Sequence, residues 1–219
     1  TVESLGGIPL IGLRDPALGG FQRFVKRLLD ILISVTLLLL TAPVFMIVAI
    51  AIKCEDGGDI FYPAKRVGEN GKHFKMLKFR SMVENADQMQ SAVNYLSENG
   101  ELIHKHAADH RITRVGRFIR RTSIDELPQI INVLKGEMSL VGPRPELPWL
   151  VDEYEPWQRK RFAVPQGITG WWQVNGRSDN LMHLHTEQDL YYIQNYSLWL
   201  DIRILWRTIN VVLRGKGAY

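Results

Sequence analysis

The chain has 219 residues, 46% of them hydrophobic, with 27 Lys and Arg against 23 Asp and Glu. This length and apolar content suit one domain with its own core and exclude intrinsic disorder, and the single cysteine, Cys54, excludes a disulfide framework. The net charge of +4 permits an anionic partner without identifying one, and the slightly negative mean hydropathy excludes a protein with several membrane spans.

Residues 31–52 form a hydrophobic segment without a charged side chain. As a straight helix they would measure about 33 Å, enough for a hydrocarbon core about 30 Å thick. Pro43 at their centre removes a backbone donor, and basic residues flank both ends, which the positive-inside rule favours on the cytoplasmic side. Both observations favour a re-entrant helix, which dips into the membrane, breaks at Pro43 and returns. A kinked spanning helix is the alternative.

The segments that follow are typical of a soluble domain. Residues 61–67 and 72–82 flank an Asn-Gly pair at 70–71, the strongest short signal for a β-hairpin. Because side chains alternate along a strand, Lys78 and Arg80 would share a face of the second strand.

Helices are predicted in most of the remaining segments. Residues 83–106 have a polar, helical composition with a break near Asn99-Gly100. Residues 165–177 predict a Gly-rich turn and a strand. Another helix is expected from about Asp125 to Lys135, and Gly136 would end it. Two further helices are expected, one over 146–162 with interruptions at Pro148 and Pro156 and one over 181–195.

The last predicted helix, residues 198–214, is amphipathic. Trp199, Ile202, Trp206, Ile209 and Leu213 recur at spacings of three and four, and arginines recur on the opposite side. An apolar face with Trp and a polar face with Arg are typical of a helix that lies in a membrane interface. An ordinary amphipathic helix packed on the core would show the same pattern.

The candidate site is Asp125-Glu126, since the chain lacks a P-loop, GxGxxG, HExxH, GxSxG and Asp-x-Asp. Read alone, the pair begins a helix, because Ser123 and Glu126 match a capping box. The surrounding cations favour a phosphate site, because Arg and Lys bind a diphosphate and a carboxylate facing phosphate needs such charges and Mg²⁺ to offset repulsion. These cations are Lys78, Arg80, Arg120, Arg144 and Arg177.

Four motifs carry a family resemblance. They are KFRSM (78–82), RRTSIDELPQ (120–129), NVLKGEMSLVGPRP (132–145) and GITGWWQVNGR (167–177). In this order they resemble the bacterial sugar transferases, which are polyprenyl-phosphate hexose-1-phosphate transferases, also called monotopic phosphoglycosyl transferases. The likeness runs from about Phe21 to the C-terminus.

The resemblance implies an α+β, mostly helical fold with a small β-hairpin element. Residues 1–20 would be a linker from an N-terminal region absent from this chain, and residues 21–55 a re-entrant membrane helix broken at Pro43. Residues 56–219 would form a cytoplasmic catalytic domain with a C-terminal amphipathic interfacial helix, 198–214. Ala42 stands where the family usually has Ser before this Pro.

The resemblance also implies a reaction at the bacterial inner membrane, with the catalytic domain on the cytoplasmic face. A sugar 1-phosphate would pass from a UDP-sugar to undecaprenyl phosphate with release of UMP, which initiates polysaccharide or glycan assembly. Asp125 matches the nucleophile that forms an aspartyl phosphosugar, Glu126 the Mg²⁺ ligand, and Arg120 a phosphate-binding residue, while Arg144 lies in the Pro-Arg-Pro loop near the nucleotide. Membrane lipids are expected partners, nucleic acid is not, and a homodimer is left open.

Two other functions fit parts of the pattern. One is a membrane-surface module that binds anionic lipid without catalysis, in which Asp125-Glu126 only caps a helix. The other is a conventional glycosyltransferase, which would release UDP; the missing Asp-x-Asp counts against it.

Overall fold

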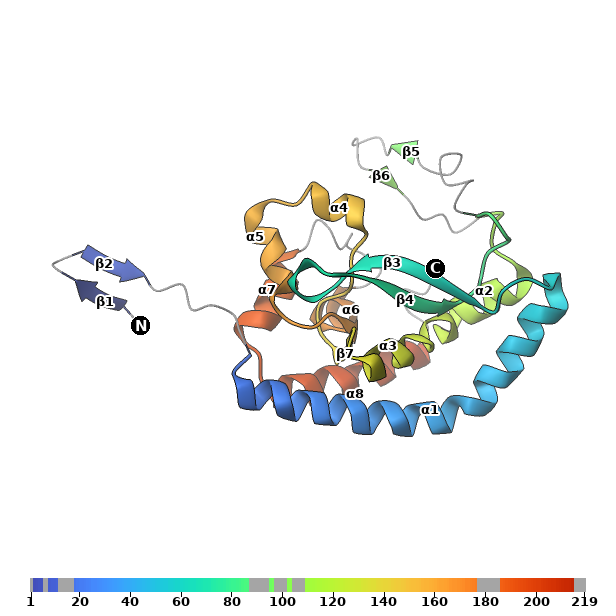
Figure 1. Ribbon diagram of the computed structural model, residues 1–219, viewed down its shortest axis with the longest axis horizontal. Coiled ribbons are helices and arrows are strands. Elements are labelled where there is room, and N and C mark those ends of the chain that lie inside the picture. The colour runs from blue at the N-terminus through green and yellow to red at the C-terminus, as the bar shows by residue number, and fades with distance from the viewer. Residues whose placement is uncertain are drawn as a thin grey trace.

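The computed structural model describes residues 2–5, 8–11, 18–86, 95–96, 102–103, 109–176 and 186–214, and within them the fold is mostly helical (Figure 1). The helices are α1 (Gly20–Asp56), α2 (Arg114–Arg121), α3 (Gln129–Lys135), α4 (Pro148–Asp152), α5 (Pro156–Arg159), α6 (Trp171–Gly176), α7 (Thr186–Gln194) and α8 (Leu198–Arg214). The strands are β1 (Val2–Leu5), β2 (Ile8–Ile11), β3 (Phe61–Val67), β4 (His73–Phe79), β5 (Tyr95–Leu96), β6 (Leu102–Ile103), β7 (Ser139–Val141) and β8 (Gly167–Thr169). They pair in sequence order as four two-stranded sheets, of which only β7–β8 is parallel.

The hairpin predicted around the Asn-Gly pair is confirmed. β3 and β4 pair antiparallel from Phe61 opposite Phe79 to Val67 opposite His73. Asn70 and Gly71 both have positive φ, 55° and 74°, which Asn and Gly tolerate better than other residues. The hairpin of β1 and β2 was not predicted.

α1 is a single helix of 37 residues, and polar side chains of its first half point into the protein. Lys26, Asp30 and Ser34, spaced four residues apart, are buried. Lys26 Nζ donates to a carbonyl oxygen of β7 at 2.8 Å and pairs with Asp201 of α8 at 2.6 Å, and Asp30 accepts a backbone N–H of β7 at 3.0 Å. Along both halves of α1 other large apolar side chains face outward, with exposures of 56–72% at Leu32, Leu39, Leu40, Met46 and Ile47.

The second half of α1 packs through apolar side chains. Val48 and Ile52 are buried against Phe79 of β4 and Ile119 of α2. At its C-terminal end α1 turns toward α2 (Figure 1), where Glu55 accepts the backbone N–H of Arg114 at 2.7 Å. By length and composition α1 can cross a membrane, and no other helix in the described part of the chain meets that criterion.

The break expected at Pro43 is not confirmed. Helical backbone continues on both sides of Pro43, and the helix bends along its length without an interruption (Figure 1). Within a helix, Pro removes one hydrogen bond and introduces a kink, which need not end the helix. Thr41 Oγ1 donates to the carbonyl oxygen of Leu37 at 2.6 Å, so a hydroxyl near Pro43 binds the helix backbone.

The helix predicted from Asp125 begins later than expected. α3 starts at Gln129, and Asp125 and Glu126 lie in a 3₁₀ turn, Ile124–Glu126, between α2 and α3. Ser123 makes no side-chain capping bond, so the predicted capping box does not form. The predicted end is right, because Gly136 has a φ of 84° and donates its N–H to α3 carbonyls.

Other predictions are confirmed in part. Residues 146–162 form α4 and α5, each beginning at a proline, and β8 lies in 165–177, where α6 was not expected. A helix was predicted over 83–106, but the described residues of this segment include the paired strands β5 and β6. An Asn-Gly pair lies between these strands in the sequence and favours a hairpin. Part of the helix predicted over 181–195 is α7, and residues 181–185 lie outside the described residues.

α8 has the predicted bounds and presents apolar residues on two sides. Leu200 and Ile204 are buried in the largest core cluster. Trp199, Ile202 and Trp206 are 49–71% exposed. The face that the sequence analysis identified is therefore not the face packed on the core.

Candidate active site

Asp125 and Glu126 lie in the turn that joins α2 to α3. Ser123 precedes them in the left-handed region at φ 57°, a conformation that is strained for a non-Gly residue and often marks functional sites. Ile124 and Leu127 on either side pack against the cluster that holds the second half of α1. The two carboxylates are thereby fixed beside the apolar helix.

Two cations from distant segments meet these carboxylates. Lys78 Nζ of β4 lies 3.0 Å from Glu126 Oε1 and 4.0 Å from Asp125 Oδ2. Arg144 Nη2, in the loop after β7, lies 2.7 Å from the same Glu126 oxygen. We call these four residues the Asp125 cluster; their side chains are 11–19% exposed, so they are shielded but reachable.

Burial raises the pKa of Asp125 above its ordinary value, and the negative charge of Glu126 raises it further. Lys78 is the strongest opposing influence, followed by Arg120 and Arg144. The ionised form of Asp125 is thus poorly solvated, and a carboxyl with a pKa shifted in this way is a candidate functional residue.

Arg120 approaches the cluster from α2. Its Nε donates to Ser81 Oγ at 2.8 Å, and burial lowers its pKa while the charge of Asp125 opposes that change. Gly116 allows this approach, because a Cβ atom there would overlap the carbonyl oxygen of Ser81. Arg120 is therefore a partly buried cation near Asp125, as the sequence predicted.

One of the predicted cations, Arg80, is not brought to the cluster. The Arg80 guanidinium pairs with Asp56 at the end of α1. Arg80 follows Phe79, the last residue of β4, so the alternation that placed it beside Lys78 no longer applies. Arg177 lies outside the described residues.

Arg66 of β3 was missed by the sequence analysis. In the hairpin register Tyr62 is opposite Lys78, and Arg66 shares the face of Tyr62 because it is four residues further along the same strand. Burial lowers the pKa of Arg66, and the charge of Arg144 lowers it further, which places Arg66 among the site cations. The period of two in residues 61–67 was the signal that could have found it.

Asn132 of α3 holds β4 beside the site. It is fully buried, its Oδ1 accepts the backbone N–H of Leu77 at 2.9 Å, and its Nδ2 donates to the carbonyl oxygen of Lys75 at 2.8 Å. These bonds fix the strand segment that carries Lys78. No sequence pattern indicated this role.

Asp125 and Glu126 are also the donors that a divalent cation could use. In residues 18–86, 109–176 and 186–211 there is no group of three or more His, Cys, Asp or Glu able to enclose a metal. Mg²⁺ commonly binds through one or two carboxylates together with waters and substrate phosphates. The donor set therefore fits an ion that a phosphate-containing substrate would help to hold.

Comparisons with known proteins identify the family of the chain. The pattern of the family described as "Bacterial sugar transferase" matches residues 21–215. The "UDP-glucose:undecaprenyl-phosphate glucose-1-phosphate transferase" of Escherichia coli is 40% identical over 100% of this chain and 46% of its own length. The "Undecaprenyl-phosphate galactose phosphotransferase" of Salmonella typhimurium is 43% identical over 90% of this chain and 42% of its own.

A shorter relative matches over most of its length. The "Exopolysaccharide production protein ExoY" of Sinorhizobium fredii is 38% identical over 89% of this chain and 88% of its own. The chain spans about half the length of the longer relatives, 42–46% for the two named above. With the family pattern matched over nearly all of its residues, the chain belongs to the bacterial sugar transferase family.

Proposed function

We propose that the protein transfers a sugar 1-phosphate from a UDP-sugar to undecaprenyl phosphate and releases UMP. The name of the Escherichia coli relative gives both substrates for that protein, and the name of the Salmonella typhimurium relative gives undecaprenyl phosphate for its own. The observation that carries the proposal for this chain is the Asp125 cluster, in which two adjacent carboxylates are surrounded by cations and remain 11–12% exposed. A site with this charge pattern can accept a diphosphate and present a nucleophile to it.

The reaction would proceed in two displacements at one phosphorus atom. An Asp125 carboxylate oxygen attacks the sugar-proximal phosphorus of the UDP-sugar, and the bond to the bridging oxygen breaks, so that UMP leaves with the electron pair. An oxygen of undecaprenyl phosphate then attacks the phosphorus of the aspartyl phosphosugar, and the acyl phosphate bond breaks, which regenerates the carboxylate. Two in-line steps replace one difficult transfer.

Glu126 would hold Mg²⁺ together with the diphosphate. When bound, the ion would neutralise charge on the phosphate oxygens. Lys78 and Arg144 contact Glu126 through the same oxygen, Oε1, and can turn toward phosphate when a substrate enters. We assign Arg120 and Arg66 to the phosphates as well, because both are partly buried cations near the cluster.

α1 and α8 would hold this site at the membrane surface with the catalytic domain on the cytoplasmic face. The outward apolar side chains of α1 and the exposed Trp199, Ile202 and Trp206 of α8 form a surface suited to lipid. Ile124 and Leu127, which flank the nucleophile, pack on the apolar cluster that contains Val48 and Ile52 of α1. A lipid phosphate confined to the headgroup plane could therefore reach Asp125. We retain the re-entrant topology for α1, with a bend in place of a break.

The test is incubation of the protein in vesicles with a UDP-sugar labelled in its sugar, with and without undecaprenyl phosphate. We expect UMP as the released nucleotide, and label on the protein when the lipid is omitted. Asp125→Asn should abolish that labelling and lower turnover by at least about 10³-fold. Asp152→Asn, an exposed carboxylate on α4, is the matched control and should behave as wild type.

Other outcomes identify the alternatives. Release of UDP would indicate a conventional glycosyltransferase. Full turnover by Asp125→Asn would exclude the covalent intermediate. Vesicle binding without nucleotide release from any UDP-sugar would favour the lipid-binding module, in which Asp125 and Glu126 only stabilise the start of a helix.

A further inference from the structure

We infer that Arg161 is a positioning residue for Arg144. Its buried side chain fixes the backbone of residues 144–146, and this backbone carries the Arg144 side chain. The inference rests on the function proposed above, because it assumes that Arg144 serves the reaction. Arg161 itself lies outside the Asp125 cluster and is fully buried, so contact with substrate is not its role.

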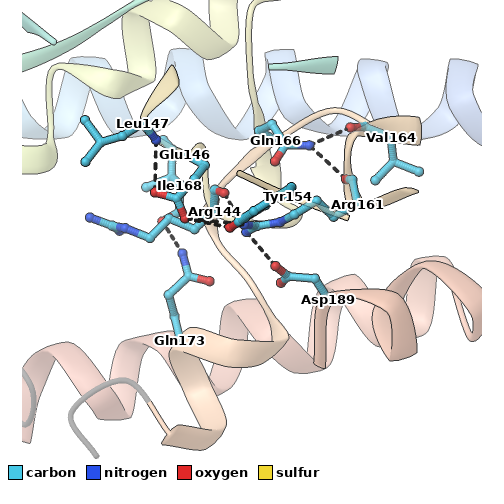
Figure 2. Close-up of polar contacts among 10 residues, drawn as sticks. All are labelled: Arg144, Glu146, Leu147, Tyr154, Arg161, Val164, Gln166, Ile168, Gln173 and Asp189. Atoms are coloured by element: carbon cyan, nitrogen blue, oxygen red, sulfur yellow. Dashed lines mark hydrogen bonds and ion pairs between the residues drawn. The ribbon is translucent and has the colours of Figure 1, made fainter. Parts of the chain in front are cut away.

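Arg161 contacts this loop directly (Figure 2). Its Nη2 donates to the carbonyl oxygen of Arg144 at 2.9 Å and lies 2.6 Å from Asp189 Oδ2 of α7. Its Nη1 donates to the hydroxyl of Tyr154 at 2.9 Å and lies 3.4 Å from Glu146 Oε2. One guanidinium thus joins α7, Tyr154 in the segment between α4 and α5, and the Arg144 loop.

Glu146 fixes the other end of the same loop. Its Oε2 accepts the hydroxyl of Tyr154 at 3.2 Å, and its carbonyl oxygen accepts the N–H of Val67 at 2.9 Å. Between Arg144 and Glu146 lies Pro145, which restricts the backbone of the residue before it. The main chain at Arg144 is therefore held from both sides, and only its side chain is left to reach Glu126.

Stability alone does not account for this group of charges. Two carboxylates and one guanidinium, 0–6% exposed, carry a desolvation penalty that well-packed apolar side chains would avoid. Directional hydrogen bonds specify a backbone position, which apolar packing does less strictly. Misplacement of a reacting group by about 1 Å can lower a rate about 10²-fold. A rigid backbone at Arg144 would therefore increase the rate of the proposed reaction.

The test is a double-mutant cycle on the rate of UMP release in vesicles. Asp189→Asn and Tyr154→Phe each remove one partner of Arg161 with little change of shape, and each is combined with Arg144→Lys, which keeps the charge. We expect either variant alone to lower kcat about 10-fold with KM for the UDP-sugar little changed. In the Arg144→Lys background the same change should lower kcat less than about 2-fold, because the positioned group is already altered.

Val151→Ala is the matched control for lost stability. Val151 belongs to the same apolar cluster as Tyr154 and makes no contact with the charges through a polar group. We expect it to lower the melting temperature and leave kcat unchanged. Equal fold-losses from Asp189→Asn or Tyr154→Phe in both Arg144 backgrounds, or no loss at all, would overturn the positioning role. Absence of UMP release from the wild type would instead overturn the proposed function.

Discussion

Two groups of charged side chains meet at residues 144–146, and water reaches them to different extents. The side chains of the Asp125 cluster are 11–19% exposed. In the Arg161 cluster, which comprises Arg161, Glu146, Asp189 and Tyr154, the three ionisable side chains that form ion pairs are 0–6% exposed. Both groups bind the loop of Arg144, one through its side chain and the other through its backbone.

The difference separates exchangeable from permanent ion pairs. A cation that must leave a carboxylate and bind phosphate needs access to solvent. The free energy lost when its ion pair with the carboxylate separates must also be small. A guanidinium enclosed by carboxylates cannot be released without leaving charges unpaired in the interior. The comparison therefore predicts losses of activity from the Asp125 cluster and losses of stability, with a secondary loss of rate, from the Arg161 cluster.

The largest effect is expected from removal of the buried guanidinium. Arg161→Met should lower the free energy of unfolding by about 3–5 kcal/mol, because it leaves Asp189 and Glu146 buried without their cation. Urea-induced unfolding followed by Trp fluorescence measures the change, with Lys160→Met, an exposed neighbour, as the control. A loss below about 1 kcal/mol would mean that the charges are solvated and that the contrast between the clusters is wrong.

Glu126→Gln should lower turnover about 10²-fold while the protein stays folded. The amide keeps the shape but loses the charge that a divalent cation and both Lys78 and Arg144 require. Titration of UMP release with MgCl₂ should show half-saturation shifted to higher concentration. Glu153→Gln, an exposed carboxylate, should leave the titration unchanged. An unchanged Mg²⁺ requirement in Glu126→Gln would remove Glu126 as a metal ligand.

Arg66 extends the comparison to a cation that the sequence analysis missed. Arg66→Ala should raise KM for the UDP-sugar about 10-fold, equivalent to one charge-assisted hydrogen bond of about 1.4 kcal/mol. Steady-state UMP release gives KM and kcat separately. Lys65→Ala, the exposed neighbour on the opposite face of β3, is the control. A change in kcat alone would mean that Arg66 binds the transition state and not the ground-state donor.

Local signals were sufficient for part of this architecture. The Asn-Gly pair predicted the β3–β4 hairpin, the spacing of apolar residues predicted α8 with its bounds, and Gly136 predicted the end of α3. The motif resemblance assigned Asp125, Glu126, Arg120 and Arg144 to one site, and the pattern of nearby cations added Lys78 together with Arg80 and Arg177. Each of these predictions depends on a few neighbouring residues or on a family motif that is recognised as a unit.

The rest depended on contacts between distant segments. The alternation of side chains along a strand predicts that two residues share a face, but it does not predict which residues this face contacts. Arg80 was therefore placed with the site, although it pairs with Asp56. The start of α3 was misplaced because the turn at Asp125 is held by packing of Ile124 and Leu127 on the apolar cluster that α1, α2 and β4 share. Arg161 was unremarkable in the sequence, because its role requires Tyr154, Asp189 of α7 and the Arg144 loop to meet.

The smallest effect concerns stability and its dependence on pH. Burial raises the pKa of Asp125, so the folded state binds this proton more tightly than the unfolded state does. The neutral carboxyl thus contributes stability at low pH that is lost as the pH rises through the raised value. Asp125→Asn cannot ionise, and we expect it to melt slightly above wild type at pH 8, with the difference narrowing as the pH is lowered.

Melting temperatures of both proteins between pH 8 and pH 5 measure this difference. The control, Asp152→Asn, alters an exposed carboxylate and should show no trend. A variant that melts below wild type at pH 8 would mean that Lys78 and Arg120 stabilise the ionised carboxylate more than burial destabilises it. In that case Asp125 would be a structural ion-pair partner like Asp189, and the distinction between the Asp125 cluster and the Arg161 cluster would no longer hold at Asp125.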